Sequence, residues 1–211
     1  MPADPNENQL FRWADDMPPQ LWDDLAARPP AEAAQATGAV WDGQGYTITM
    51  LGREHRLEPK SRRVFLTADP EHRLSYQTGL VLISTLIRSL GVPPAGRMVT
   101  PQELPGGAQF FQGPHAINNR PLAERFGDDP AALLEAALAL GGEAFEAGDQ
   151  GVRLPGLPMI PLYALIWEGD EEFSPRAVVG MDANAHYHLA LDGIWALSNL
   201  MVFRLLKEGP V

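Results

Sequence analysis

Leu157-Pro-Met-Ile-Pro-Leu-Tyr-Ala-Leu-Ile-Trp167 is followed by the acidic run Glu168-Gly-Asp-Glu-Glu172 and then by Arg176-Ala-Val-Val-Gly-Met-Asp182. The two flanks are apolar, and the run between them has the glycine and acidic residues of a turn. The stretch therefore predicts two strands joined by an acidic hairpin. An apolar run from Asp192 predicts a closing helix.

Upstream, residues 38–66 change to an alternating pattern. Tyr46, Ile48 and Met50 are separated by threonines, which is typical of a half-buried strand. Turn residues on both sides predict a meander of about three strands. After it, Asp69-Pro70 resembles a helix start, and the apolar positions from there to Leu90 predict a largely buried helix.

These elements predict an α+β fold. We expect one mainly antiparallel sheet, formed by the meander and the C-terminal strands, with helices packed largely on one face. Residues 70–90 and 190–207 would be the inner helices. Residues 1–36 are acidic and proline-rich and predict a helical arm, so that residues 37–211 form a single α+β domain.

Composition excludes several classes of protein. The chain has 211 residues, of which 45% are hydrophobic and 20% charged, as in an ordinary globular protein. Its net charge of -11 opposes binding to a phosphate backbone, so we expect no nucleic-acid partner. It contains no cysteine, which excludes a Cys-ligated iron–sulfur cluster within this chain.

The N-terminal residues and the longest apolar run indicate where the protein is located. The first residues lack a basic region followed by an apolar one, so they do not predict a signal peptide. The longest apolar run, residues 80–90, is shorter than the ~20 residues that span a bilayer. We therefore expect a cytoplasmic protein with no membrane partner.

Several segments of the chain resemble the domain of unknown function 3786 family of anaerobic bacteria and archaea. Those segments are residues 75–90, 98–107, 121–127, 140–142, 148–149 and 157–197, and Trp167-Glu-Gly-Asp-Glu-Glu-Phe173 is the most specific of them. The resemblance implies a setting in anaerobic metabolism but no reaction and no catalytic residue. Some members carry a cysteine-rich segment of iron–sulfur type, and this chain departs from them.

The best chemical candidate is His186-Tyr-His188. On a strand, residues two apart point to one face, so both imidazoles would reach one ligand, together with Asp182. Two histidines and a carboxylate suit zinc or ferrous iron. The alternative is a turn at residues 182–184, followed by two histidines that are partly exposed residues of a strand.

A second group of candidates would bind a flat anion. Arg53, Arg56 and Arg62 belong to the main basic cluster, and Trp167 precedes the acidic turn, where it would face a cleft. The alternative is that these arginines pair with nearby carboxylates. The crowded acids at residues 168–172 similarly predict either a cation or base site, or a solvated hairpin tip.

Three hypotheses for function follow. The first is a non-catalytic accessory protein of anaerobic metabolism that binds a cofactor or other small ligand, such as a tetrapyrrole or corrinoid, with His186 or His188 as axial ligand. The second is a metal-dependent enzyme that uses His186, His188 and Asp182, with a carboxylate of residues 168–172 as general base. The third is a protein–protein adaptor without cofactor. No catalytic signature decides whether the chain is an enzyme.

Overall fold

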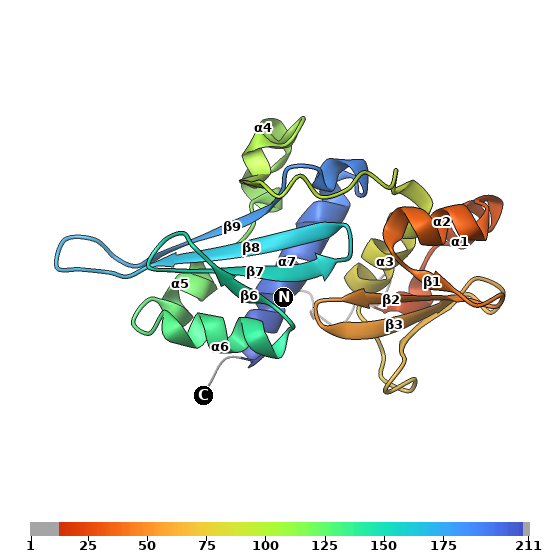
Figure 1. The fold of residues 1–211 in the computed structure, drawn as a ribbon, viewed down its shortest axis with the longest axis horizontal. Coiled ribbons are helices and arrows are strands. Elements are labelled where there is room, and N and C mark those ends of the chain that lie inside the picture. The colour runs from red at the N-terminus through yellow and green to blue at the C-terminus, as the bar shows by residue number, and fades with distance from the viewer. Residues whose placement is uncertain (1–12, 209–211) are drawn as a thin grey trace, which may run out of the picture.

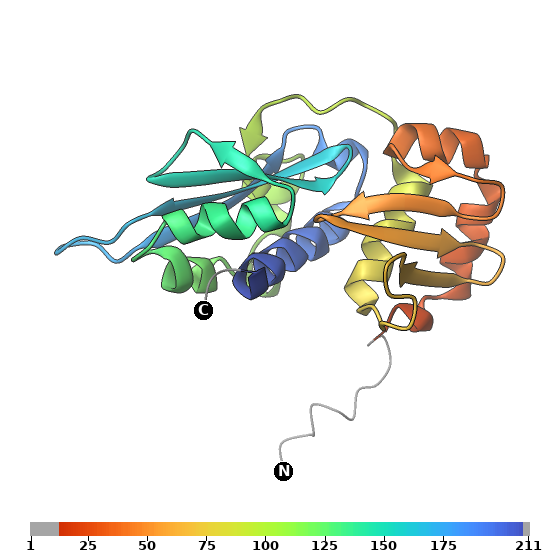
Figure 2. The same ribbon diagram turned by 60° about the horizontal axis from the view of Figure 1, so that its bottom comes forward.

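The computed structural model describes residues 13–208, which form two lobes (Figure 1). The N-terminal lobe comprises residues 13–90 and the C-terminal lobe residues 98–208. An extended linker, residues 91–97, connects them along one edge of the molecule (Figure 2). Helix α7 runs through the middle of the molecule and packs against helix α3 of the other lobe.

The N-terminal lobe is one antiparallel sheet with helices on one face. The sheet order is β1 (Val40–Trp41), β2 (Tyr46–Met50), β3 (Arg53–Glu58) and β4 (Arg63–Leu66). Along β2, Tyr46, Ile48 and Met50 are buried, as their alternation predicted. The helices are α1 (Pro19–Ala27), α2 (Pro30–Thr37) and α3 (Tyr76–Arg88), which pack against one another (Figure 2).

Helix α3 begins later than predicted. Residues 70–75 form turns, and the Ser75 side chain caps the helix by accepting a hydrogen bond from the backbone N–H of Thr78 at 3.2 Å. At the other end, Arg28 donates from its guanidinium to the carbonyls of Leu86, Ile87 and Ser89. The segment predicted as an appended arm therefore closes the end of the central helix. Residues 1–12 of that arm lie outside the described residues.

The C-terminal lobe is a second antiparallel sheet. Its order is β5 (Met98–Val99), β9 (Arg176–Asp182), β8 (Ile160–Trp167), β7 (Gln150–Leu157) and β6 (Glu143–Phe145). The predicted hairpin is the β8–β9 pair, whose turn projects to the left in Figure 1. The helices of this lobe are α4 (Gly107–Phe110), α5 (Arg120–Phe126), α6 (Ala131–Ala139) and α7 (Leu191–Glu208).

The α+β class, the antiparallel pairing and the packing of helices on one side are confirmed. The expectation of one sheet is not met, because the meander and the C-terminal strands form two sheets. The linker follows α3 and leads into the C-terminal lobe, where β5 pairs with β9 and not with a strand of the meander. Within residues 13–208, none of the helices combines the length and apolar character that crossing a bilayer needs.

The turn between β2 and β3 joins the two lobes. The backbone N–H of Leu51 donates to the carbonyls of Pro155 and Gly156 in β7, each at 3.1 Å. Leu51 and Gly52 both have positive φ angles, 49° and 74°, which make the turn tight enough to insert. A Cβ atom on Gly52 would lie 2.6 Å from the carbonyl oxygen of Leu140, so only glycine fits there.

Candidate functional site

The two histidines predicted to lie on a strand do not. Residues 185–187 form a 3₁₀ helix, named η4 (Ala185–Tyr187), and His188 follows it. The prediction was wrong because β9 ends at Asp182, and the following residues turn to carry the chain toward α7. The imidazoles therefore do not share the face of a strand, and their surroundings differ.

His188 is fully buried and makes hydrogen bonds through both ring nitrogens. Nε2 donates to the carbonyl of Val92 at 2.9 Å, and Nδ1 lies 2.7 Å from Oγ of Ser89. Burial is the main influence on the ring and lowers the pKa of His188. To coordinate a metal or the metal of a tetrapyrrole, this ring would have to give up the hydrogen bond at one of its two nitrogens. His186 is half-buried, and its Nδ1 lies 3.0 Å from the carbonyl of Ala183.

Asp182 anchors the same linker. Its carboxylate is fully buried and accepts hydrogen bonds from the backbone N–H groups of Ala95, Gly96 and Asn184, at 2.8, 2.8 and 2.9 Å. Three such donors stabilise a buried negative charge and satisfy three backbone groups. Asp182 and His188 thus fix the linker to the C-terminal lobe.

The predicted metal ligands are not assembled into one site. Across residues 13–208, no group of three or more His, Asp or Glu side chains lies close enough together to hold a metal ion. In the acidic turn, Asp170 accepts from the backbone N–H groups of Glu172 and Phe173, so its carboxylate shapes the hairpin tip. Metal binding and the metal-dependent reaction stay predictions.

The basic cluster divides between two faces of the N-terminal sheet. Arg53 and Arg56 lie three positions apart on β3 and therefore point to opposite faces. Arg56 pairs with Asp42 at 2.8 Å, and Arg62 pairs with Asp23 at 2.7 Å. The predicted partner of these arginines, Trp167, lies at the end of β8 with the Arg176 guanidinium 4.0 Å from its ring centre. The predicted cofactor residues thus occupy separate places.

Arg53 instead borders a cleft of about 480 Å³ between the lobes. Sheet residues of β2, β3 and β4 form one wall, the first turn of α3 the second, and the C-terminal half of α7 the third. The apolar part of the lining is formed by Trp13, Met50, Leu51, Leu66, Leu74, Leu200 and Phe203, and the polar part by Arg53, His55, His72, Arg73, Ser75, Thr78, Arg204 and Lys207. We call this space the interlobe cleft.

The charge of the interlobe cleft is positive. Arg53, Arg73, Arg204 and Lys207 line it, and its lining contains no aspartate or glutamate. Glu208 lies at the border, 3.4 Å from Arg53 and 3.2 Å from Arg204. Burial and then the charge of Arg53 lower the pKa of Arg204, and its Nε has no hydrogen-bond partner among the described residues. The cleft therefore concentrates positive charge that its own carboxylates only partly balance.

His55 lies in the wall of the same cleft and is 3% exposed. Its Nδ1 lies 2.9 Å from the carbonyl of Arg53, which can only accept, so the neutral ring donates from Nδ1. Burial is the largest cause that lowers the pKa of His55 to about 4, and the charges of Arg204 and Arg53 add to it. His55 is therefore neutral at pH 7.

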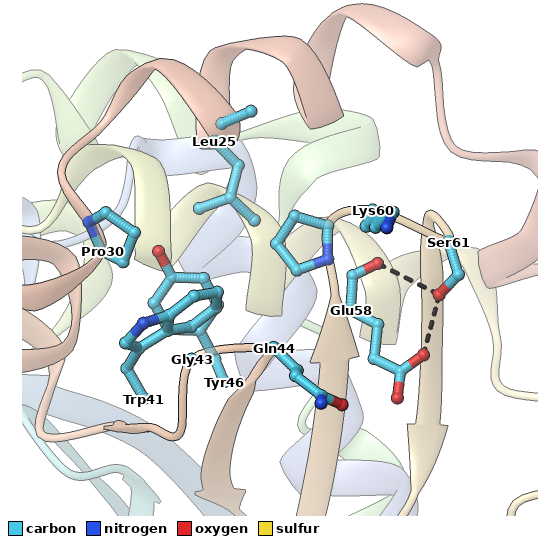
Figure 3. A pocket seen from close by; sticks show the side chains of 11 residues that line it. Leu25, Pro30, Trp41, Gly43, Gln44, Tyr46, Glu58, Lys60 and Ser61 are labelled. Carbon is cyan, nitrogen blue, oxygen red and sulfur yellow. Dashed lines mark hydrogen bonds between the residues drawn. The ribbon is translucent and has the colours of Figure 1, made fainter.

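A second hollow, of about 910 Å³, opens on the other side of the N-terminal lobe (Figure 3). Trp41 and Tyr46 form its floor, with ring centres 4.7 Å apart, and Leu25 and Pro30 stand over them. Its rim carries Lys60 as its single cation among lining residues of the described chain. This hollow is larger than the interlobe cleft but has no comparable concentration of charge.

Fold and cleft together define a two-lobed α+β protein with a basic cleft at the lobe junction. A family model described as Domain of unknown function (DUF3786) matches residues 29–204, and the chain belongs to this family. The family resemblance inferred from the sequence is therefore confirmed. Neither the curated proteins nor the solved structures contain a match to this chain.

Proposed function

We propose that this protein is a non-catalytic binding protein that takes a small ligand with a carboxylate or phosphate group in the interlobe cleft. One observation carries the proposal: four cationic side chains line a cleft whose charge is only partly balanced by Glu208 and Asp15, in a chain whose net charge is -11. Such local reversal of charge raises the concentration of an anionic ligand at the cleft and speeds its encounter.

The side chains of the cleft suit a carboxylate or phosphate. Guanidinium groups bind both in bidentate fashion. Arg53 lies on β3, Arg73 in the segment before α3 and Arg204 on α7, so they would surround a ligand. Glu208 pairs with both Arg53 and Arg204 and competes with a ligand there. Asp15, the present partner of Arg73, is a weak competitor. The Arg73–Asp15 pair is 3.4 Å long and more than half exposed on both sides, where an ion pair contributes about 0–1 kcal/mol.

Titration calorimetry with pyrophosphate and with citrate tests the proposal. We expect binding by the wild type that weakens as salt is added, and at least a tenfold loss of affinity in Arg204→Met and Lys207→Met. Arg120→Met is the matched control, because Arg120 lies on α5 with 83% of its side chain exposed. Absence of binding at millimolar anion, or an equal loss in the control, would reject the proposal.

A tetrapyrrole or corrinoid is one flat anion of this class, and its binding stays a prediction, as do the anaerobic role and the cytoplasmic location. An absorption spectrum and elemental analysis of protein purified without oxygen test the pigment and the metal-dependent alternative. The adaptor alternative predicts a partner in a pull-down that is lost when residues 1–36 are deleted.

A further inference from the structure

One face of α7 connects the interlobe cleft to a third hollow. Leu200, Phe203, Arg204 and Lys207 line the cleft, whereas Asp192, Trp195 and Ala196 line a hollow of about 690 Å³ nearer the start of the helix. These positions recur every three or four residues, so they follow one face of the helix. Ser75, the cap of α3, lines both spaces, which places them next to each other. We call the hollow lined by Asp192, Trp195 and Ala196 the ring pocket.

The ring pocket is lined by aromatic and apolar groups together with the polar side chains of Ser75, Gln77 and Asp192. The Trp195 and His115 rings meet edge to face with centres 6.0 Å apart, and Phe110 stacks on His115 at 4.5 Å. Leu80 and Ala196 complete the apolar lining. Nε1 of Trp195 is buried and has no hydrogen-bond partner within the described chain, so a donor at the wall of this pocket is unused.

The charge differs between the two ends of this face of α7. Asp192 borders the ring pocket and disfavours an anion there, whereas Arg204 and Lys207 favour one in the cleft. Arg204 lies nine positions after Trp195, which corresponds to about 14 Å along a helix. A molecule that used both ends would carry a flat uncharged group and an anionic group about this far apart.

We propose that the ring pocket and the interlobe cleft together form one binding site for a nucleotide-like ligand, a heteroaromatic ring joined through a linker to a phosphate. The ring lies against Trp195, and the phosphate is bound by Arg204 and its neighbours. This proposal rests on the proposed function and adds to it the chemical class of the ligand. Aromatic stacking is tolerant of ring type, so the class is defined by shape and charge.

Three probes separate the contributions: pyrophosphate for the anion alone, riboflavin for a ring alone, and flavin mononucleotide for both joined. We expect flavin mononucleotide to bind at least tenfold more tightly than either other probe. Trp195→Leu should lower its affinity about tenfold and leave pyrophosphate binding unchanged. Trp167→Leu, at a distant half-buried tryptophan, should change neither. Because Trp195 supports the helix packing, His115→Ala, at an exposed position, provides a second variant with the same expected direction.

The outcomes distinguish this inference from the proposed function. If pyrophosphate binds but flavin mononucleotide binds no more tightly, or if Trp195→Leu and His115→Ala leave its affinity unchanged, the ring pocket is not part of the site and the inference falls alone. If pyrophosphate does not bind the wild type, the proposed function fails and this inference fails with it.

Discussion

Ser89 and His188, 99 residues apart in the chain, share a buried hydrogen bond of 2.7 Å between Oγ and Nδ1. Ser89 follows the last turn of α3 in the N-terminal lobe, whereas His188 follows β9 and η4 in the C-terminal lobe. Since Nε2 of the same ring donates to Val92 in the linker, one side chain of the C-terminal lobe binds both the end of the N-terminal lobe and the start of the linker.

Replacing His188 should therefore destabilise the whole fold. His188→Leu removes the partner of the Val92 carbonyl and one of the hydrogen bonds of the Ser89 hydroxyl, at a cost of about 2–4 kcal/mol in the free energy of unfolding. His186→Leu is the matched control, because His186 is half-buried and makes one hydrogen bond, and it should cost less than about 1 kcal/mol. Urea denaturation measures both. Equal losses would contradict the structural role of His188.

Replacing the buried Asp182 should also lower the free energy of unfolding more than replacing an exposed aspartate. Asp182→Asn removes the charge and one acceptor from a site that receives three backbone N–H groups, and we expect a loss of about 2–3 kcal/mol. Asp149→Asn is its control, since Asp149 is exposed and accepts one backbone N–H, that of Glu168. Thermal unfolding of the two variants should differ clearly. A stable Asp182→Asn protein would show that the linker does not depend on this carboxylate.

His55 should make the protein sensitive to acid. Its pKa is about 4 in the folded protein, below the ordinary histidine pKa of 6.5, so the unfolded chain binds more protons between these pH values. Stability is therefore fully present above pH 6.5 and falls as the pH decreases toward 4, by about 3 kcal/mol from this group. Burial also lowers the pKa of His188, which acts in the same direction.

Unfolding free energies of the wild type and His55→Gln, measured from pH 7 to pH 4, isolate this contribution. The variant should lose less stability over the range, because glutamine does not titrate, while His188 and the carboxylates contribute equally to both proteins. Parallel curves for the two proteins would contradict the lowered pKa of His55.

The glycine in the β2–β3 turn should be irreplaceable for a reason beyond its φ angle. Gly52→Ala places a methyl group against the Leu140 carbonyl and adopts a positive φ, and we expect a loss of about 2–4 kcal/mol. Gly43→Ala has a positive φ but open space around it, so it should lose about 1 kcal/mol. If the two variants unfold at the same denaturant concentration, the contact between the lobes adds nothing to stability.

The elements of this fold could be predicted from local patterns, but their arrangement could not. The alternation in β2 and the apolar flanks of the 168–172 turn are properties of neighbouring residues, and both predicted the right elements. The number of sheets depends on long-range pairing: β9 and β8 pair with β5 and β7 and with no strand of the meander.

Only part of the candidate site could be predicted, because its residues are brought together by packing between distant segments. Arg53 was recognised from its basic neighbours in sequence, yet Arg56, on the opposite face of the strand, does not share its cleft. Arg73, Arg204 and Lys207 were missed, because they join Arg53 only when α7 packs on α3. The spacing of Leu200, Phe203, Arg204 and Lys207 on one face of a helix is the signal that could have indicated them.

The attachment of the β2–β3 turn to β7 has a kinetic consequence. Leu51 lines the interlobe cleft and is held by two backbone carbonyls of the other lobe, so the walls of the cleft are set before any ligand arrives. A preformed site avoids the entropic cost of ordering its walls on binding. The association rate should then be governed by ionic strength, through the steering of an anion toward the arginines, and the lifetime of the complex by the contacts made inside.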